Sequence, residues 1–453
     1  MSRRNREKRA ERRRDRQRRG PTPPRSGFSG SHGPGCTCGG PDDFWTPHPV
    51  PAPELVANTL LAAARDDAYG DSTAAAARAA ELTSGRFAGQ PRAVATGAGI
   101  ALTEVAHRLW QAGWLPVDAW EITRRRADAA PTGLLVDVIA EDSARYGSAV
   151  DERWAAQVRQ LDATVWWDRG RPHLSQWAER HGADLERALL VTVELLAVLV
   201  TLPELPRIVA PPGTAARGSS APVSRVDGKI LDRVRGLLAK AESTEYPEEA
   251  EALSAKAQEL MNRHAFERAL LDAEADRRQT ATSTRLWLDN PYVEAKSHLV
   301  AAIAQANRCR SVFYPKLGFV ALIGEGMDLE ITELLTLSLL VQATRAMVAE
   351  GSQITRAGAS RTRSFRQSFL VAYATRIGER LDEAAVRAHD PTEDARLLPV
   401  LAKRSRVVEE TFAAMFSHTV QRSVSVTNGA GWRAGRAAAD RADLTLERDA
   451  INA

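Results

Sequence analysis

Arginine is the residue type whose spacing most clearly suggests chemistry in this sequence. Residues 1–25 contain twelve Arg and Lys and only three acidic residues, a net charge of +9, so the remaining residues carry −5 if the whole chain carries +4. The guanidinium group matches phosphate geometry, and each neutralised phosphate releases counterions. We therefore predict salt-dependent contact of this basic arm with DNA or RNA, with a solvated tail that aids solubility as the alternative. The candidate residues are Arg3, Arg4, Arg12, Arg13 and Arg14.

A second basic cluster stands at the start of a predicted long helix. Phe365, Phe369, Tyr373 and Ile377 recur there every four residues, which is the period of a buried helix face. The nearby arginines should then flank that face on the exposed side, where they either bind phosphate or pair with acidic residues. The cluster contains Arg356, Arg361, Arg363 and Arg366, and the predicted nucleic-acid-binding residues in it are Arg361, Arg363 and Arg366.

Motifs for metal binding and catalysis are weaker. The C-x-C pair lacks a second CxxC or His pair, so we interpret its surroundings as a Gly/Pro-rich linker and predict neither a metal nor a cofactor. No HExxH, GxxxxGK[ST] or GxSxG motif occurs, and Cys309 has no evident His partner in the sequence, which favours a buried structural thiol. The zinc-type side chains of the linker are His32, Cys36, Cys38 and His48.

An enzyme whose site is assembled from distant residues is the first alternative to nucleic-acid association. Such a site would need two or more carboxylates converging with a His or Lys in one pocket. The sequence defines no catalytic residue, so the candidates are only starting points. They are Glu325, Asp328, Glu330, Glu333 and Lys240.

A protein-interaction module is the second alternative, and it rests on tryptophan. Seven of the ten tryptophans lie within residues 54–203, where helix packing is their simplest role. A partner surface would instead require an exposed apolar tryptophan patch. The seven are Trp110, Trp114, Trp120, Trp154, Trp166, Trp167 and Trp177.

The number of cysteines and the hydropathy of the sequence indicate the cellular compartment. Three cysteines cannot cross-link a chain of 453 residues, which is typical of the reducing cytoplasm. The basic N-terminus is not followed by the apolar stretch of a secretory signal. Residues 189–203 form the most apolar run, but it is shorter than the roughly 20 residues of a membrane span and contains Glu194. We predict a cytoplasmic protein with no membrane partner.

Composition divides the chain into six segments. Gly, Pro and Ser mark the two linkers, and apolar residues at helical spacing mark the segments between them. The predicted segments are a disordered basic arm (1–19), a Gly/Pro-rich linker (20–53), an all-helical domain (54–203), a second linker (204–226), a helical hairpin domain (227–280) and an α+β domain (281–446).

The last segment combines strand and helix patterns. β-branched and aromatic residues predict strands, two of which should pair as a hairpin around residues 315–317. The fold class is therefore mainly α with an α+β C-terminal domain, in which a small sheet is packed by long helices. The predicted strands are 284–289, 310–314, 318–324 and a weaker 423–427, and the predicted helices are 292–307, 327–349, 362–388 and 430–443.

The helical hairpin carries a family resemblance. Leu237–Leu238 is followed by Lys240–Ala241, then by a Thr/Pro/acidic turn with Glu249–Ala250, and then by Lys256–Ala257 and Leu260–Met261. This pattern over residues 229–264 resembles the bacterial domain of unknown function 2786. The resemblance implies a two-helix unit and brings no established activity.

The residues behind the hairpin resemble the partner domain of that family. Residues 284–443 look like domain of unknown function 7168, on the stretches 322–335, 363–381 and 429–444. The order of the two domains and the Ala/Arg usage resemble actinobacterial proteins. Together with the two basic clusters, these observations lead to the hypothesis of a cytoplasmic, nucleic-acid-associated protein.

Overall fold

The structure is a computed structural model that describes part of the chain, with gaps. The basic arm, residues 20–51 of the first linker and all but three residues of the predicted hairpin lie outside the described residues. The structure describes residues 52–147, 149–214, 233, 236, 240, 281–353, 360–387, 391–420 and 426–442.

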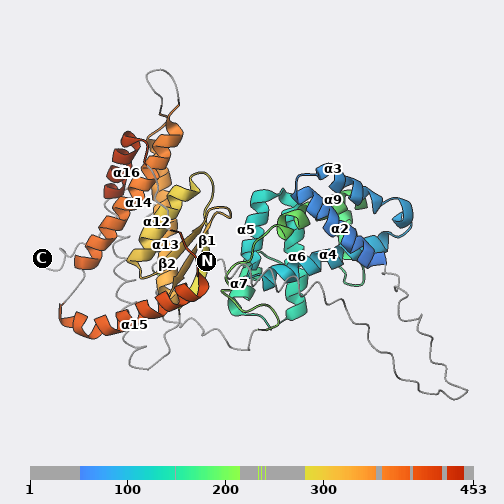
Figure 1. Ribbon diagram of the computed structural model, residues 1–453, viewed down its shortest axis with the longest axis horizontal. Helices are drawn as coiled ribbons and strands as arrows, with labels where there is room; N and C mark the ends of the chain where they lie inside the picture. Colours follow the sequence, from blue (N-terminus) through green and yellow to red (C-terminus); the bar gives the residue numbers. More distant parts are fainter. Residues whose placement is uncertain are drawn as a thin grey trace, which may run out of the picture. The chain divides into compact units, whose positions relative to one another are not determined.

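Residues 52–214 contain helices and no strand among those described, as the sequence predicts (Figure 1). Local chemistry fixes several of the helix starts. Pro91 and Pro116 occupy first helical positions, where a missing N–H has no cost. Asp71 and Asp184 accept backbone N–H groups as N-caps. The elements are α2 (Ala52–Ala68), α3 (Ser72–Glu81), η1 (Gly85–Phe87), α4 (Pro91–Gln111), α5 (Pro116–Arg126), α6 (Ala129–Tyr146), α7 (Glu152–Gln160), α8 (His173–His181) and α9 (Leu185–Val200).

The core of this helical part is built around α9 and the tryptophans. Leu189, Leu195 and Leu196 of α9 are fully buried, so the most apolar run of the sequence is a core helix. Trp114 donates its indole N–H to the carbonyl of Pro203, 2.8 Å away. None of the seven tryptophans between residues 54 and 203 is exposed, which confirms helix packing as their role.

A three-stranded antiparallel sheet follows, with strands β1 (Thr282–Trp287), β2 (Arg310–Tyr314) and β3 (Phe319–Gly324). The strand order is β1-β3-β2, so β3 lies at the centre, and all of its residues are buried. The predicted hairpin between β2 and β3 is confirmed, with Gly318 at a φ of 88° in its turn.

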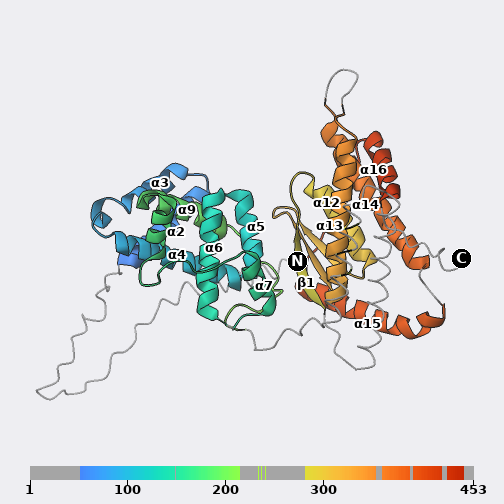
Figure 2. The same ribbon diagram turned by 180° about the vertical axis from the view of Figure 1, so that it is seen from behind.

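Both faces of the sheet are covered. Phe319 and Ala321 join the core of the helical part, while Val320 and Leu322 face the opposite way. This second face packs against α12 (Val293–Ala306) and α13 (Gly326–Ala349) (Figure 2). The alternation of side chains along β3 therefore joins the sheet to helices on both sides.

A buried ion pair holds the strand β1 to α5. Arg285 and Asp118 approach within 2.5 Å, and both side chains are at least 95% buried. Arg285 also donates to the carbonyls of Gly113 and Pro206, and Asp118 accepts the indole N–H of Trp287. Because every partner of this pair is a protein group, the pair is satisfied without water.

Three further helices complete the C-terminal part: α14 (Thr362–Arg387), α15 (Pro391–Met415) and α16 (Gly429–Arg441). Helices α13, α14 and α16 match the predicted ranges closely, whereas α15 was not predicted. Pro399 lies inside α15. Because a proline normally interrupts a helix, the sequence pattern does not predict this one. The strand predicted at 423–427 lies largely outside the described residues.

Helix α13 also meets the length and composition of a membrane span. In the described part of the chain it is the one helix that does so, and 44% of its apolar window is buried inside the structure. A core helix passes the same test, so length and composition alone do not place it in a membrane.

Candidate nucleic-acid interface

The predicted phosphate-binding residues of the second cluster lie at the start of α14. Arg361 directly precedes the helix, and Arg363 follows in its first turn; both side chains are exposed. Arg366 is half-buried, and its Nε atom is buried with no hydrogen-bond partner. Arg356 and the basic-arm residues Arg3, Arg4, Arg12, Arg13 and Arg14 lie outside the described residues.

Backbone contacts fix where α14 begins. Arg361 donates its backbone N–H to the carbonyl of Gln353, 2.8 Å away, and accepts the backbone N–H of Phe365. The Thr362 hydroxyl accepts the backbone N–H of Gln353 at 3.0 Å. The end of the preceding loop and the first turn of the helix are therefore tied together, which places Arg361 and Arg363 on a defined surface.

The aromatic stripe of α14 faces inward, as predicted. Phe365, Phe369, Tyr373 and Ile377 are each at most 3% exposed. Their side chains pack in one core with α12, α13 and α16. A base-stacking platform of these rings is therefore not available, and the arginines remain as the groups that face solvent.

Helix α16 runs beside α14 in the same direction. Gly431 packs against the carbonyl of Phe365, and Gly435 packs against the carbonyl of Phe369, one turn further along both helices (Figures 1 and 2). A Cβ atom at either glycine would clash with the carbonyl it faces. The G-x-x-x-G spacing thus allows the two helices to approach closely. Because the helices are parallel, both begin at the same end of the pair.

The parallel packing adds a fourth arginine, Arg433, to the start of α14. Arg433 is the fifth residue of α16, and its guanidinium group lies 3.8 Å from the position that a Cβ atom would take at Gly429. Asn428 caps α16 by accepting two backbone N–H groups, and its own N–H donates to the hydroxyl of Ser368 on α14. Sequence reasoning missed Arg433 as a site residue because only the G-x-x-x-G contact brings it to this end.

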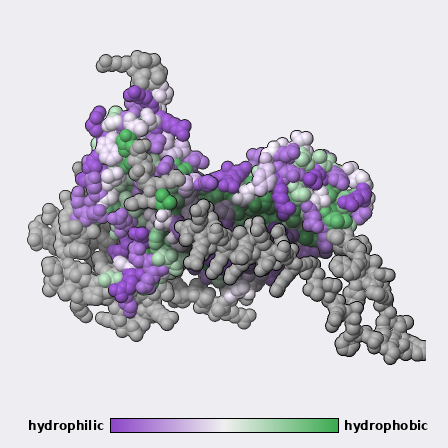
Figure 3. Space-filling view, in the orientation of Figure 1, coloured by the Kyte–Doolittle hydropathy of each residue, from purple (hydrophilic) through white to green (hydrophobic). Residues whose placement is uncertain are grey.

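We call Arg361, Arg363, Arg366 and Arg433 the helix-start arginines. Among the residues that the structure describes, none of the four pairs with a carboxylate. Hydrophilic side chains gather at the top of this part in Figure 3, where α14 begins in Figure 1. Two parallel helix N-termini add partial positive charge at the same place. The arrangement can therefore receive phosphate groups with both charge and hydrogen-bond donors.

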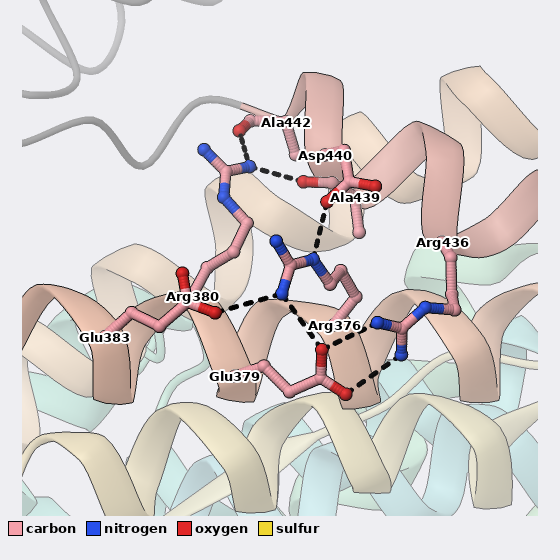
Figure 4. Close-up of polar contacts among 8 residues, drawn as sticks. All are labelled: Arg376, Glu379, Arg380, Glu383, Arg436, Ala439, Asp440 and Ala442. Atoms are coloured by element: carbon pink, nitrogen blue, oxygen red, sulfur yellow. Dashed lines mark hydrogen bonds and ion pairs between the residues drawn. The ribbon is translucent and has the colours of Figure 1, made fainter.

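The second half of α14 is different, because its arginines are neutralised (Figure 4). Arg376 pairs with Asp440 at 2.5 Å, Glu379 at 3.0 Å and Glu383 at 3.1 Å. Arg436 reaches Glu379 with two parallel hydrogen bonds of 2.9 and 2.8 Å. These bonds from Arg436 and Arg376 lower the pKa of Glu379 to about 2.

Arg380 belongs to the same network at the end of α16. It donates to the carbonyls of Ala439 and Ala442, which a helix C-terminus leaves without intrahelical partners. The guanidinium groups of this half thus hold α14 to α16. They do not offer a free cationic surface.

Three of the carboxylates proposed for an enzyme site make separate structural contacts. Glu325 accepts the backbone N–H of Met327 as the N-cap of α13. Asp328 pairs with Arg308 at 2.5 Å, and Glu333 accepts the hydroxyl of Thr284. None of the candidates Glu325, Asp328, Glu330, Glu333 and Lys240 lines either of the two large cavities found in the described residues.

Cys309 is a buried thiol, as the sequence predicts. Burial raises its pKa to about 12, so the thiol stays protonated and unreactive. His32, Cys36, Cys38 and His48 lie outside the described residues, and within the described ones no three His, Cys, Asp or Glu side chains form a metal-binding group.

Comparison with known proteins confirms the resemblance of the hairpin segment. Residues 229–268 match the family model described as Protein of unknown function (DUF2786). No curated protein and no solved structure matches the chain. The match covers a short segment of the 453 residues and carries no activity, so the functional argument rests on the geometry of the arginines.

Proposed function

We propose that this chain is a cytoplasmic, nucleic-acid-associated protein that contacts phosphates through the helix-start arginines. The observation behind the proposal is the separation of charge along α14. Its first turns and those of α16 present guanidinium groups without carboxylate partners among the described residues, whereas Arg376 and Arg436 are neutralised.

The expected binding is electrostatic and weakly selective for sequence. Neither an exposed aromatic platform nor a groove-reading helix is formed by the described start of α14, so contacts to phosphates dominate. The basic arm within residues 1–25 would add affinity through its charge of +9. The proposal therefore includes both DNA and RNA as ligands, and the affinity for either should fall steeply as the salt concentration rises.

A binding titration with matched variants tests this function. The triple variant R361Q/R363Q/R366Q removes three cationic groups and keeps good helix formers in α14. We expect binding of labelled duplex DNA or RNA to weaken, and the slope of log affinity against log salt to fall by up to about 3. The control R65Q/R86Q/R187Q removes three exposed arginines of the helical part and should keep more of the affinity.

Two outcomes would contradict the proposal. One is the absence of binding by the wild-type chain at about 50 mM salt, where phosphate contacts are strongest. The other is an equal loss of affinity in both triple variants, which would reduce the effect to net charge. Deletion of residues 1–25 separates the arm from the helix-start arginines, and retention on heparin should fall without disappearing.

We further propose that residues 284–443 belong with the domain of unknown function 7168 in an actinobacterial protein. This rests on the resemblance of three stretches and on their position directly behind the matched segment 229–268. A structure of any member of that domain would test it, because the order β1-α12-β2-β3-α13-α14 should recur.

A further inference from the structure

A cleft in the helical part is built from other elements than those that carry the helix-start arginines. It encloses about 1150 Å³ between α4 and α6, and residues 167–173 line one end, which we call the loop end. Ala95, Gly99 and Val138 give the cleft small apolar walls, and Trp167 lines it at the loop end. A cleft of this volume is large enough to hold a small organic molecule with an apolar body.

The charged side chains of the cleft lining are five arginines and four carboxylates. Three of the arginines are neutralised by a carboxylate, and one of these three carboxylates lies outside the lining. Their charge is therefore not available to a ligand. The pairs within the lining are Arg108–Glu104 and Arg145–Asp142, and Arg171 pairs with Glu179 outside it.

The other two lining arginines, Arg92 and Arg169, pair with no carboxylate in the described part of the chain, and both side chains are exposed. Arg92 donates to the carbonyl of Gly170 at 3.5 Å, which places its guanidinium group beside the loop that contains Arg169. The loop is itself held in shape, because Gly170 donates its backbone N–H to the Asp168 side chain at 2.9 Å. Two guanidinium groups without carboxylate partners therefore lie at the loop end.

The carboxylate at the loop end already has partners. Asp137 accepts the indole N–H of Trp166 at 2.8 Å with one oxygen, and its other oxygen lies 2.9 Å from Nε2 of His173. Glu141 has no partner within the described ranges, and it lies one turn further along α6. The charged groups that the loop end leaves for a ligand are thus the two guanidinium groups.

We propose that the cleft binds a small organic anion. Its phosphate or carboxylate head contacts Arg92 and Arg169 at the loop end, and its apolar body lies along the small side chains of α4. Guanidinium groups bind both kinds of head through charge and through paired N–H donors. The site does not depend on the proposed nucleic-acid function, because all of its residues belong to the helical part.

Titration of the full-length chain with three ring compounds tests the site. Phenyl phosphate and benzoate carry the two anionic heads, and benzylamine carries an ammonium group on the same ring. The readout is the indole N–H resonance of Trp167, which lines the cleft and is 7% exposed. We expect saturable shifts with phenyl phosphate and benzoate and no shift with benzylamine. The ratio of the two anion affinities then shows which head the site prefers.

Two variants of equal charge separate this site from an effect of net charge. R92Q/R169Q removes both exposed guanidinium groups and leaves the core unchanged, and it should weaken the binding of phenyl phosphate about tenfold. R65Q/R187Q removes two exposed arginines of the helical part that lie outside the cleft lining. This control should keep the wild-type affinity within about twofold.

Three results would overturn the proposal. The first is that neither anion shifts the Trp167 resonance up to about 10 mM. The second is an equal affinity of R92Q/R169Q and R65Q/R187Q for phenyl phosphate, which would show that Arg92 and Arg169 take no part. The third is that benzylamine binds as tightly as the anions, which would reduce the site to a pocket for the ring alone.

Discussion

The two ends of the α14–α16 pair carry the same residue type in opposite roles. At the start, Arg361, Arg363 and Arg433 lack carboxylate partners in the described part of the chain. Further along, Arg376 on α14 and Arg436 on α16 share Glu379, and each guanidinium group is held by at least two hydrogen bonds. Arginine content alone therefore does not measure the charge that a surface can offer to a polyanion.

Arg285 extends the comparison to the interior. It is 97% buried and is satisfied by Asp118 and two backbone carbonyls. The chain thus uses arginine in three settings: buried and paired, exposed and paired, exposed and unpaired. Removing the carboxylate partner should destabilise the fold more at the buried pair than at an exposed pair, because a buried charge that loses its partner cannot turn to water.

Asp118→Ala should give the largest effect on stability. It leaves Arg285 buried without its carboxylate and removes the acceptor of Trp287, so we expect a loss of about 3–5 kcal/mol. Urea denaturation measures it. The exposed pair of Arg159 and Glu152 supplies the control, and Glu152→Gln should cost no more than about 0.5 kcal/mol. Similar losses in both variants would refute the ordering by burial.

Gly435→Val tests the contact that brings the two helices together. A side chain there meets the carbonyl of Phe369, so α16 must move away from α14, at about 2–3 kcal/mol. Gly429→Ala is the matched control because its Cβ position is open apart from Arg433. Wild-type stability of Gly435→Val in denaturation would show that α14 and α16 do not pack as described.

Glu379→Gln tests the neutralised half by pH. The pKa of Glu379 falls from 4.5 to about 2 in the folded chain, so its stabilising effect is complete above about 4.5 and is lost as the pH falls towards 2. Because the carboxylate is 39% exposed, the effect should be at most about 1 kcal/mol. Melting temperatures of the variant should lie below wild type at pH 7 and converge with it near pH 2. A constant difference across that range would contradict the assignment.

The sequence predicted local elements better than long-range pairs. The strand at 310–314 and the inward aromatic stripe of α14 follow from spacing alone, and both were found. The partners of the arginines could not be predicted, since Arg376 meets Asp440 at 64 residues' separation and Arg285 meets Asp118 at 167. Only packing decides such pairs, and the same packing adds Arg433 to the site.

Gln367→Glu should give the smallest effect and sharpens the comparison most directly. It places a carboxylate four residues after Arg363 on α14, within reach of an i,i+4 pair, and so imitates the neutralised half at the helix start. All arginines remain, yet we expect nucleic-acid affinity to fall about two- to threefold at low salt, with little change in stability. The matched control is Gln305→Glu on α12, which adds the same charge elsewhere. Equal losses in both variants would show that overall charge, and not the unpaired state of these arginines, governs binding.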